Sequence, residues 1–178
     1  RAAFIATLNN KQTCILVPTT LLASQHFASF EERFQDSGIS IAVLSRNISL
    51  KEREKLLQGL RSGEIDIVIG THALLQRNIK FNDLGLLIID EEHRFGVRQK
   101  EKINSLRAGV DILTMTATPI PRTLNMAISG LRDLSIIATP PERRLSIKTF
   151  INKKSDHVVK EAIQREILRG GQVFYLHN

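Results

Sequence analysis

The sequence has 178 residues, 42% of them hydrophobic and 24% charged, which suffices for one domain with a packed core and part of a second. Lysine and arginine exceed aspartate and glutamate by 25 to 18, and this net charge of +7 favours a polyanionic partner, although an ordinary basic surface would give the same surplus. We expect no membrane span, no signal peptide and, with Cys14 as the single cysteine, no internal disulfide, as in a cytoplasmic protein with a buried thiol.

Short apolar segments alternate with longer segments of helical period, the pattern of a parallel α/β sheet. We predict strands over residues 13–17, 40–44, 66–70, 86–90 and 111–116. Helices are predicted for residues 21–34, after Ser49 and after Pro121. The second of these begins with a capping box formed by Ser49 and Glu52, and Gly63 is expected to end it.

The two consecutive prolines at 140 and 141 interrupt regular structure and indicate a linker. We therefore divide the chain into residues 1–140 and residues 141–178. The second part is predicted to contain a strand over 147–151, a helix over 156–168 and a strand over 172–176, too little for a complete domain.

The strongest candidate for a catalytic site is the tetrapeptide Asp90-Glu91-Glu92-His93, which follows a strand that is apolar throughout. Ligands bind at the carboxyl ends of strands in open α/β sheets, so these carboxylates lie where a substrate would be. Asp90 is suited to a Mg²⁺ shell, and Glu91 to orienting or deprotonating a water molecule. An acidic turn after a buried strand is the alternative.

Three further strand ends carry small, polar or hydroxyl residues. They are Pro18, Thr19 and Thr20; Gly70, Thr71 and His72; and Thr116, Ala117, Thr118 and Pro119. The first two groups offer hydroxyls and amides to phosphates, and the third can hydrogen-bond the acidic motif on the neighbouring strand. Each has a structural alternative: Thr20 as a helix N-cap, Gly70 as a turn residue, and a threonine-rich strand end closed by Pro119.

The order of these strand ends resembles motifs Ia, Ib, II and III of superfamily 2 helicases, and residues 172–178 resemble the start of motif IV. Residues 81–98 and 116–137 are similar to the bacterial transcription-repair coupling factors, and this similarity covers nearly the whole chain. The related RecG-type helicases share the segments at 93–97 and 116–123. They differ at Glu92, where they usually have glutamine, and they lack the Leu-Arg-Asp-Leu-Ser-Ile-Ile-Ala-Thr-Pro-Pro run.

This resemblance implies a RecA-like motor lobe with a parallel sheet flanked by helices, followed by the beginning of a second RecA-like lobe. It implies ATP and Mg²⁺ as cofactors and translocation on double-stranded DNA. RNA polymerase and excision-repair proteins would be partners through modules outside this chain. Asp90 and Glu91 would be catalytic, with Asp90 toward Mg²⁺. The residues that couple nucleotide state to the DNA-facing side would be His93, Thr116, Ala117 and Thr118. Contacts with the DNA backbone would come from Pro18, Thr19, Thr20, Gly70, Thr71 and His72.

The phosphate-binding loop, Gly-x-x-x-x-Gly-Lys-[Ser/Thr], does not occur in these 178 residues. We expect the chain to begin inside the helix that follows this loop and to hydrolyse little or no ATP by itself. The strand that precedes the loop is expected beside the strand that carries Asp90. Without it, an exposed sheet edge could mediate dimerisation.

Two alternative functions remain. One is a branch-migration helicase of the RecG type. The other is a non-catalytic nucleic-acid-binding domain, against which the Asp90-Glu91 pair argues, because such a module has no use for both carboxylates.

Overall fold

The computed structural model describes residues 1–45, 48–106, 109–117, 133–137, 139 and 147–177. The chain divides into two compact units, Arg1–Asp133 and Leu134–Asn178, and each is described by itself. The helix predicted after Pro121 lies outside the described residues.

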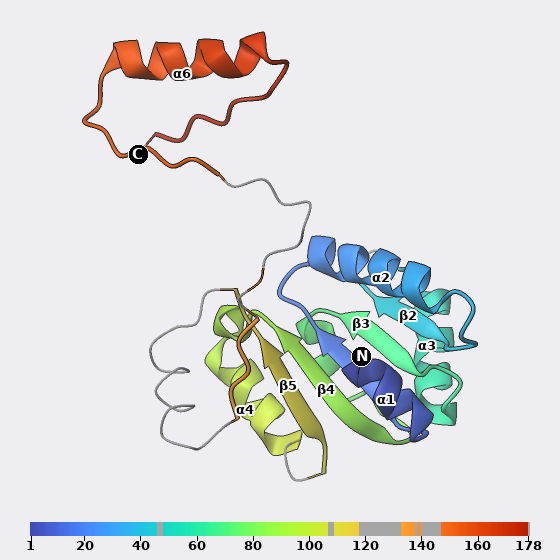
Figure 1. Cartoon of the computed structure of the whole chain (residues 1–178). Helices are drawn as coiled ribbons and strands as arrows, with labels where there is room; N and C mark the ends of the chain where they lie inside the picture. The colour runs from blue at the N-terminus through green and yellow to red at the C-terminus, as the bar shows by residue number, and fades with distance from the viewer. Residues whose placement is uncertain (46–47, 107–108, 118–132, 138, 140–146, 178) are drawn as a thin grey trace. The chain divides into compact units, whose positions relative to one another are not determined.

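The first unit is built on a five-stranded sheet in which every pair of neighbouring strands is parallel (Figure 1). Its order is β2-β3-β1-β4-β5. The strands are β1 (Gln12–Leu16), β2 (Ile41–Leu44), β3 (Ile67–Gly70), β4 (Leu84–Asp90) and β5 (Asp111–Met115). All five predicted strands are present, with ends that shift by no more than two residues, and the α/β fold class is confirmed.

Helices cover both faces of this sheet (Figure 1). On one face, α1 (Ala2–Leu8) and α2 (Thr20–Phe34) contribute Ala3, Ala23 and Phe34 to a core with the buried side chains of the sheet. On the other face, α3 (Leu50–Ser62) and α4 (Val97–Leu106) contribute Leu56, Leu60 and Ile103. Because β1 lies between two strands and two helix layers, all five of its residues are buried, as continuous apolar strands predict.

Local sequence signals fix the ends of α3. The Ser49 hydroxyl accepts a hydrogen bond from the Glu52 amide at 3.2 Å, and the Ser49 amide donates to the Glu52 carboxylate at 2.9 Å. This reciprocal pair is the predicted capping box. Gly63 ends the helix with φ of 84°, in the left-handed region that glycine adopts without strain.

The position of Asp90 in the sheet corrects one expectation. The strand β4 is hydrogen-bonded to β1 on one side and to β5 on the other, so no further strand fits beside it. In the described part of the chain the edges are β2 and β5. Any additional strand would therefore join beyond β2 or beyond β5, instead of next to the strand that carries Asp90.

The second unit contains α6 (Asp156–Leu168), at the position predicted from the sequence. The structure assigns no strand to residues 147–151 or 172–176, both of which are described. Their apolar residues suit a strand, but a strand also needs a neighbour for its backbone hydrogen bonds, and neither segment forms such a ladder here.

Candidate active site

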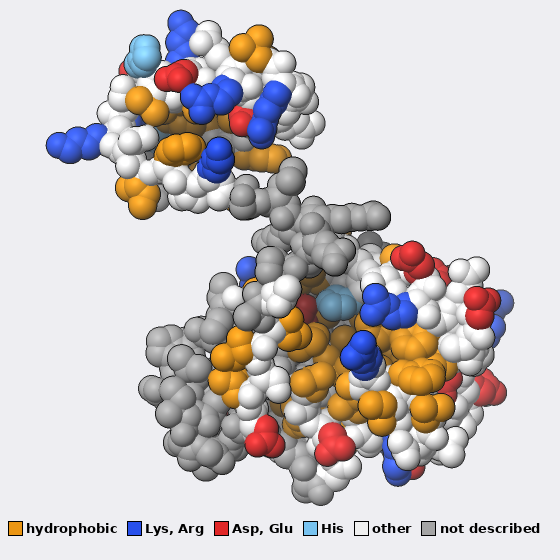
Figure 2. Space-filling model, viewed as in Figure 1, with side chains coloured by type: hydrophobic (Ala, Val, Ile, Leu, Met, Phe, Trp, Pro, Cys, Tyr) orange, Lys and Arg blue, Asp and Glu red, His pale blue; other side chains and the backbone are white. Residues whose placement is uncertain are grey.

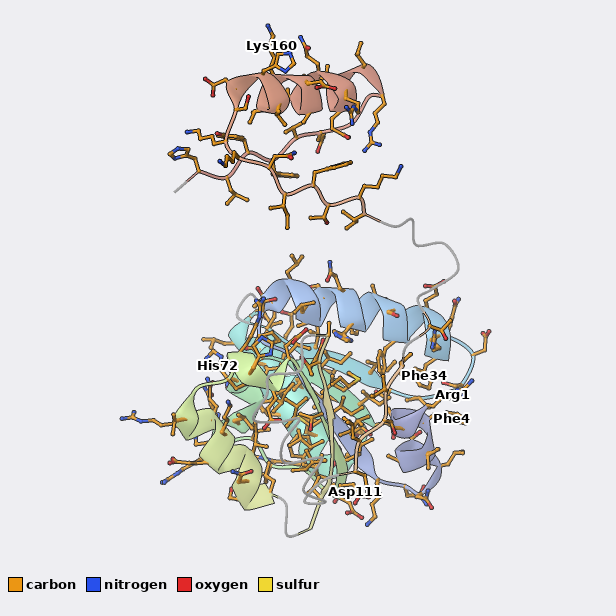
Figure 3. All side chains as sticks on the ribbon, turned by 60° about the vertical axis from the view of Figure 1, so that its left-hand side comes forward. Arg1, Phe4, Phe34, His72, Asp111 and Lys160 are labelled. Atoms are coloured by element: carbon orange, nitrogen blue, oxygen red, sulfur yellow. The ribbon has the colours of Figure 1, made fainter. Side chains whose placement is uncertain are left out.

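Four strand ends meet at one edge of the sheet. Leu16 at the end of β1 is in register with Gly70 of β3 and with Ile89 of β4, and Asp90 is in register with Met115 of β5. Figure 3 labels His72 at this end of the sheet and Asp111, the first residue of β5, at the opposite end. The segments after β1, β3, β4 and β5 therefore form one site, as expected for parallel strands.

Glu91 has an unusual backbone conformation. Its φ and ψ are 54° and 53°, the left-handed helical region, which costs a residue other than glycine about 1–2 kcal/mol. The Glu91 amide donates a hydrogen bond to the carbonyl of Met115 at 2.9 Å, which extends the pairing of β4 with β5 by one residue. The chain then turns into a short 3₁₀ helix, η2 (Glu92–Arg94). Strained backbone of this kind is often found at functional sites.

The Glu91 side chain is held on both carboxylate oxygens. The Thr116 hydroxyl donates to Oε2 at 2.9 Å, and the Ala117 amide donates to Oε1 at a longer 3.5 Å. His93 Nδ1 lies 3.2 Å from Oε2. The structure thus places three of the four predicted coupling residues in contact with Glu91. The fourth, Thr118, lies outside the described residues, as does Pro119.

Asp90 has a partner that the sequence analysis missed. His26 Nε2 of α2 lies 3.0 Å from Asp90 Oδ2, and the two side chains are 24% and 20% exposed. The available signal was helical periodicity, because His26 is four residues after Leu22 and four before Phe30, and both of these pack on the sheet. A histidine on the sheet-facing side of that helix indicates a polar contact with a strand end.

The donor set at this edge fits Mg²⁺ held mainly by a substrate. The described residues contain no group of three or more histidine, cysteine, aspartate or glutamate side chains that could enclose a metal. Mg²⁺ commonly takes one or two carboxylates and completes its shell with water and phosphate oxygens. Asp90, partly exposed at the strand end and with one oxygen already hydrogen-bonded, matches such a site.

The segment after β1 begins α2. Thr19 is the N-cap of the helix, and its hydroxyl accepts a hydrogen bond from the Leu22 amide at 3.2 Å. The alternative that Thr20 caps the helix is therefore wrong by one residue, because Thr20 is the first helical residue. Thr19 and Thr20 are exposed and Pro18 is half-buried, so the two hydroxyl residues are accessible to a ligand at this edge. Contact with DNA stays a prediction.

The segment after β3 is more enclosed. Gly70 and Thr71 are buried, and His72, the first residue of the 3₁₀ helix η1 (His72–Leu75), is exposed. A Cβ on Gly70 would lie 2.6 Å from the Leu44 carbonyl oxygen and 2.9 Å from Leu74 Cδ1, so close packing alone requires glycine there. Of the three residues predicted to touch DNA here, His72 alone presents an exposed side chain.

The outer surface of the first unit is partly apolar. Figure 2 shows hydrophobic side chains gathered over α1 and β5. Phe4, Ile5, Leu8, Leu113 and Met115 are between 38% and 67% exposed. In the described part of the chain, no helix is long and apolar enough to cross a bilayer.

A parallel sheet in this order, with an Asp-Glu pair at the end of β4 and a hydroxyl-bearing strand end bonded to it, is typical of the RecA-like fold of superfamily 2 helicases. Residues 2–127 match the model of the DEAD/DEAH box helicases. The chain belongs to the DEAD/DEAH box helicase family, and its predicted resemblance to superfamily 2 helicases is confirmed.

Among curated proteins, the transcription-repair-coupling factors of Haemophilus influenzae and Escherichia coli are 66% and 64% identical to this chain over all 178 residues. The chain spans 16% of the length of each. Among solved structures, RecG bound to a three-way DNA junction superposes with a TM-score of 0.71 at 41% identity, over 90% of this chain and 22% of that one. The helicase Lhr of Mycobacterium smegmatis, at 16% identity and a TM-score of 0.55 over 79% of this chain and 19% of that one, shares the fold alone.

Proposed function

We propose that this chain is the part of the first motor lobe that carries the ATP-hydrolysis residues of an ATP-dependent double-stranded DNA translocase. The observation that carries the proposal is the Glu91 carboxylate, which is fixed by Thr116 and Ala117 of the neighbouring strand end beside Asp90. The names of its relatives and the DNA-bound RecG structure support a DNA substrate.

In this proposal Asp90 would hold Mg²⁺ through its partly exposed carboxylate, and the cation, when bound, would neutralise charge on the phosphates of ATP. Glu91 orients the attacking water and accepts its proton. Because Thr116 Oγ1 and the Ala117 amide already donate to the two Glu91 oxygens, this carboxylate does not need to reorganise when a water molecule arrives.

We assign the coupling of nucleotide state to DNA binding to the contacts that hold the Glu91 carboxylate. His93, Thr116 and Ala117 touch Glu91 directly, so a movement of the segment after β5 would displace the catalytic carboxylate. Thr118 is proposed to continue this segment. Thr19, Thr20 and His72 are exposed at the same edge and would contact the DNA backbone with Pro18, Gly70 and Thr71, the last two through backbone atoms.

The chain by itself is proposed to be inactive as an ATPase. Its 178 residues lack the loop whose amides and lysine would hold the β- and γ-phosphates, so Asp90 and Glu91 would meet a weakly bound substrate. The edge strand β5, with Leu113 and Met115 more than one third exposed, is the place where two copies of this chain could pair.

The biological role that we propose is displacement of stalled RNA polymerase and coupling of transcription to excision repair in the cytoplasm. Polymerase and repair proteins would bind parts of the protein outside these residues. A RecG-type branch-migration activity is the alternative, and the 41% identity to RecG supports it. This support is weaker than that of the 66% identity to a coupling factor.

Release of RNA polymerase from DNA tests this role. The full-length protein and ATP should release a polymerase stalled on duplex DNA by nucleotide starvation, and Glu91→Gln should abolish the release. Glu54→Gln, an exposed substitution on α3, serves as the control and should leave release intact. Regression of a synthetic fork without polymerase release would favour the RecG-type alternative, and binding of DNA without either activity would favour a non-catalytic module.

A further inference from the structure

Asp90 is oriented by a side chain from a different layer of the fold. His26 lies on α2, 64 residues away in sequence, and its Nε2 is 3.0 Å from Asp90 Oδ2. A carboxylate only accepts hydrogen bonds, so Nε2 must carry the proton in this contact. The contact therefore requires a ring form with a proton on Nε2, and it orients the carboxylate.

Among the described residues, no side chain or amide is hydrogen-bonded to the other oxygen of Asp90, Oδ1. Oδ2 is occupied by His26, the side chain remains 20% exposed, and Glu91 follows Asp90 directly in the chain. Carboxylates that bind cations are commonly hydrogen-bonded in this way, and loss of such an outer partner typically costs about 10–100-fold in metal affinity or activity.

Packing alone does not account for a histidine at this position. The neighbours of His26 on the same helix face, Leu22, Phe27 and Phe30, pack against the apolar core. Because the imidazole is only 24% exposed, its nitrogens need water or a protein group as a partner, and Nε2 contacts the first residue of the acidic motif. Helix α2 also starts at Thr20, about 9 Å along the helix axis from His26, so this rigid element joins Asp90 to the end predicted to touch DNA.

We propose that His26 is a positioning residue for Asp90: its Nε2–H holds Oδ2 and thereby presents the carboxylate to the Mg²⁺ of bound ATP. This assignment rests on the proposed function, and it adds a residue outside the acidic motif to the hydrolysis site. His26 does not touch the substrate and takes no part in proton transfer.

Kinetics of the full-length protein with duplex DNA test the positioning role. His26→Phe keeps a flat ring and removes the donor, whereas His26→Gln restores an N–H donor. We expect His26→Phe to raise the Mg²⁺ concentration for half-maximal ATP turnover about tenfold or more, and His26→Gln to return it to within about threefold of wild type. Gln25→Ala, an exposed neighbour on α2, should change nothing. An unchanged Mg²⁺ requirement in His26→Phe, or an equal rise in both His26 variants, would overturn the proposal.

A second measurement on the 178-residue chain needs no ATP. Nitrogen-15 NMR of the His26 ring should show a single tautomer with the proton on Nε2, and Asp90→Ala should convert it to a mixture. Asp83→Ala, which removes an exposed carboxylate paired with Lys11, should leave the His26 signals as they are. A His26 ring with its proton on Nδ1 would contradict the contact, and so would nitrogen-15 signals that do not change in Asp90→Ala. If the wild-type protein showed no turnover while this result held, the proposed function would fail and the contact would stand.

Discussion

Replacing Gln12 by leucine should remove four hydrogen bonds that tie the start of β1 to its surroundings. Gln12 is 5% exposed. Its Nε2 donates to the carbonyls of Leu60 and Ile65 at 3.0 and 2.7 Å. Its Oε1 accepts from the amides of Asn82 and Asp83 at 2.8 and 3.0 Å. One side chain thus joins the end of α3, the approach to β3 and the approach to β4.

The expected cost follows from these four contacts. Leucine has a similar volume, so the loss is chiefly that of the hydrogen bonds, each worth about 0.5–1.5 kcal/mol net, with more lost where a backbone group is left buried without a partner. Only the bond to Leu60 is fully buried, and water can reach the other three sites. We therefore expect Gln12→Leu to lower the free energy of unfolding by about 3 kcal/mol and the melting temperature by about 9 °C.

Urea denaturation followed by circular dichroism measures this change. Gln58→Leu, an exposed substitution of the same type on α3, is the matched control and should shift the free energy of unfolding by less than about 0.5 kcal/mol. A loss below about 1 kcal/mol for Gln12→Leu, or equal losses in the two variants, would refute the reasoning that this buried amide joins the layers.

Four further measurements on three residues test the core. Thr13→Val should leave the free energy of unfolding unchanged or raise it by up to about 1 kcal/mol in urea titrations, because Thr13 Oγ1 is buried and has no hydrogen-bond partner among the described residues; a clear loss would reveal a missing partner. Burial raises the pKa of the Cys14 thiol from 9.0 to about 12, so a thiol reagent at pH 8 should label the chain only after denaturation. Because the thiol ionises at a lower pH in the unfolded chain than in the folded chain, the free energy of unfolding should also fall as the pH rises from about 9 to 12. A urea midpoint that stays constant over that range would contradict this. Gly70→Ala should cost about 1–3 kcal/mol in thermal unfolding, because its Cβ would meet the Leu44 carbonyl at 2.6 Å; an unchanged melting temperature would show that β2 and β3 can separate.

The strands and helix ends of the first unit follow from local sequence. Continuous apolar runs predicted β1 and β4, and the Ser49–Glu52 pair with Gly63 predicted both ends of α3. These features depend on residues that are close in sequence. Strand order does not, and the expected neighbour of the Asp90 strand was wrong because pairing of β4 with β5 is decided by packing between distant segments.

The site likewise combines features that the sequence pattern predicts with contacts between distant segments that it does not predict. That Glu91 and Thr116 would meet was predictable, because both follow parallel strands and the carboxyl ends of such strands share an edge. The contact of His26 with Asp90 joins a helix to a strand 64 residues away, and no motif predicts it. The left-handed backbone of Glu91 was also unpredictable, since glutamate has no preference for that conformation.

In the second unit, α6 follows from helical periodicity, and its predicted range of 156–168 is the range observed. The two flanking strand predictions were wrong, because an apolar alternation reports only the tendency of a segment to be half-buried. Whether such a segment becomes a strand depends on a hydrogen-bonding neighbour, and neither 147–151 nor 172–176 forms a ladder in the structure.

ATP turnover by the full-length protein, with and without duplex DNA, tests the central claim most directly when wild type is compared with Glu91→Gln. The substitution preserves the size of the side chain and can keep the contact with Thr116, but it removes the base. The account predicts turnover that duplex DNA stimulates and that falls on the order of 10²-fold or more in Glu91→Gln. DNA-stimulated turnover that survives Glu91→Gln would place the catalytic carboxylate elsewhere and contradict the account.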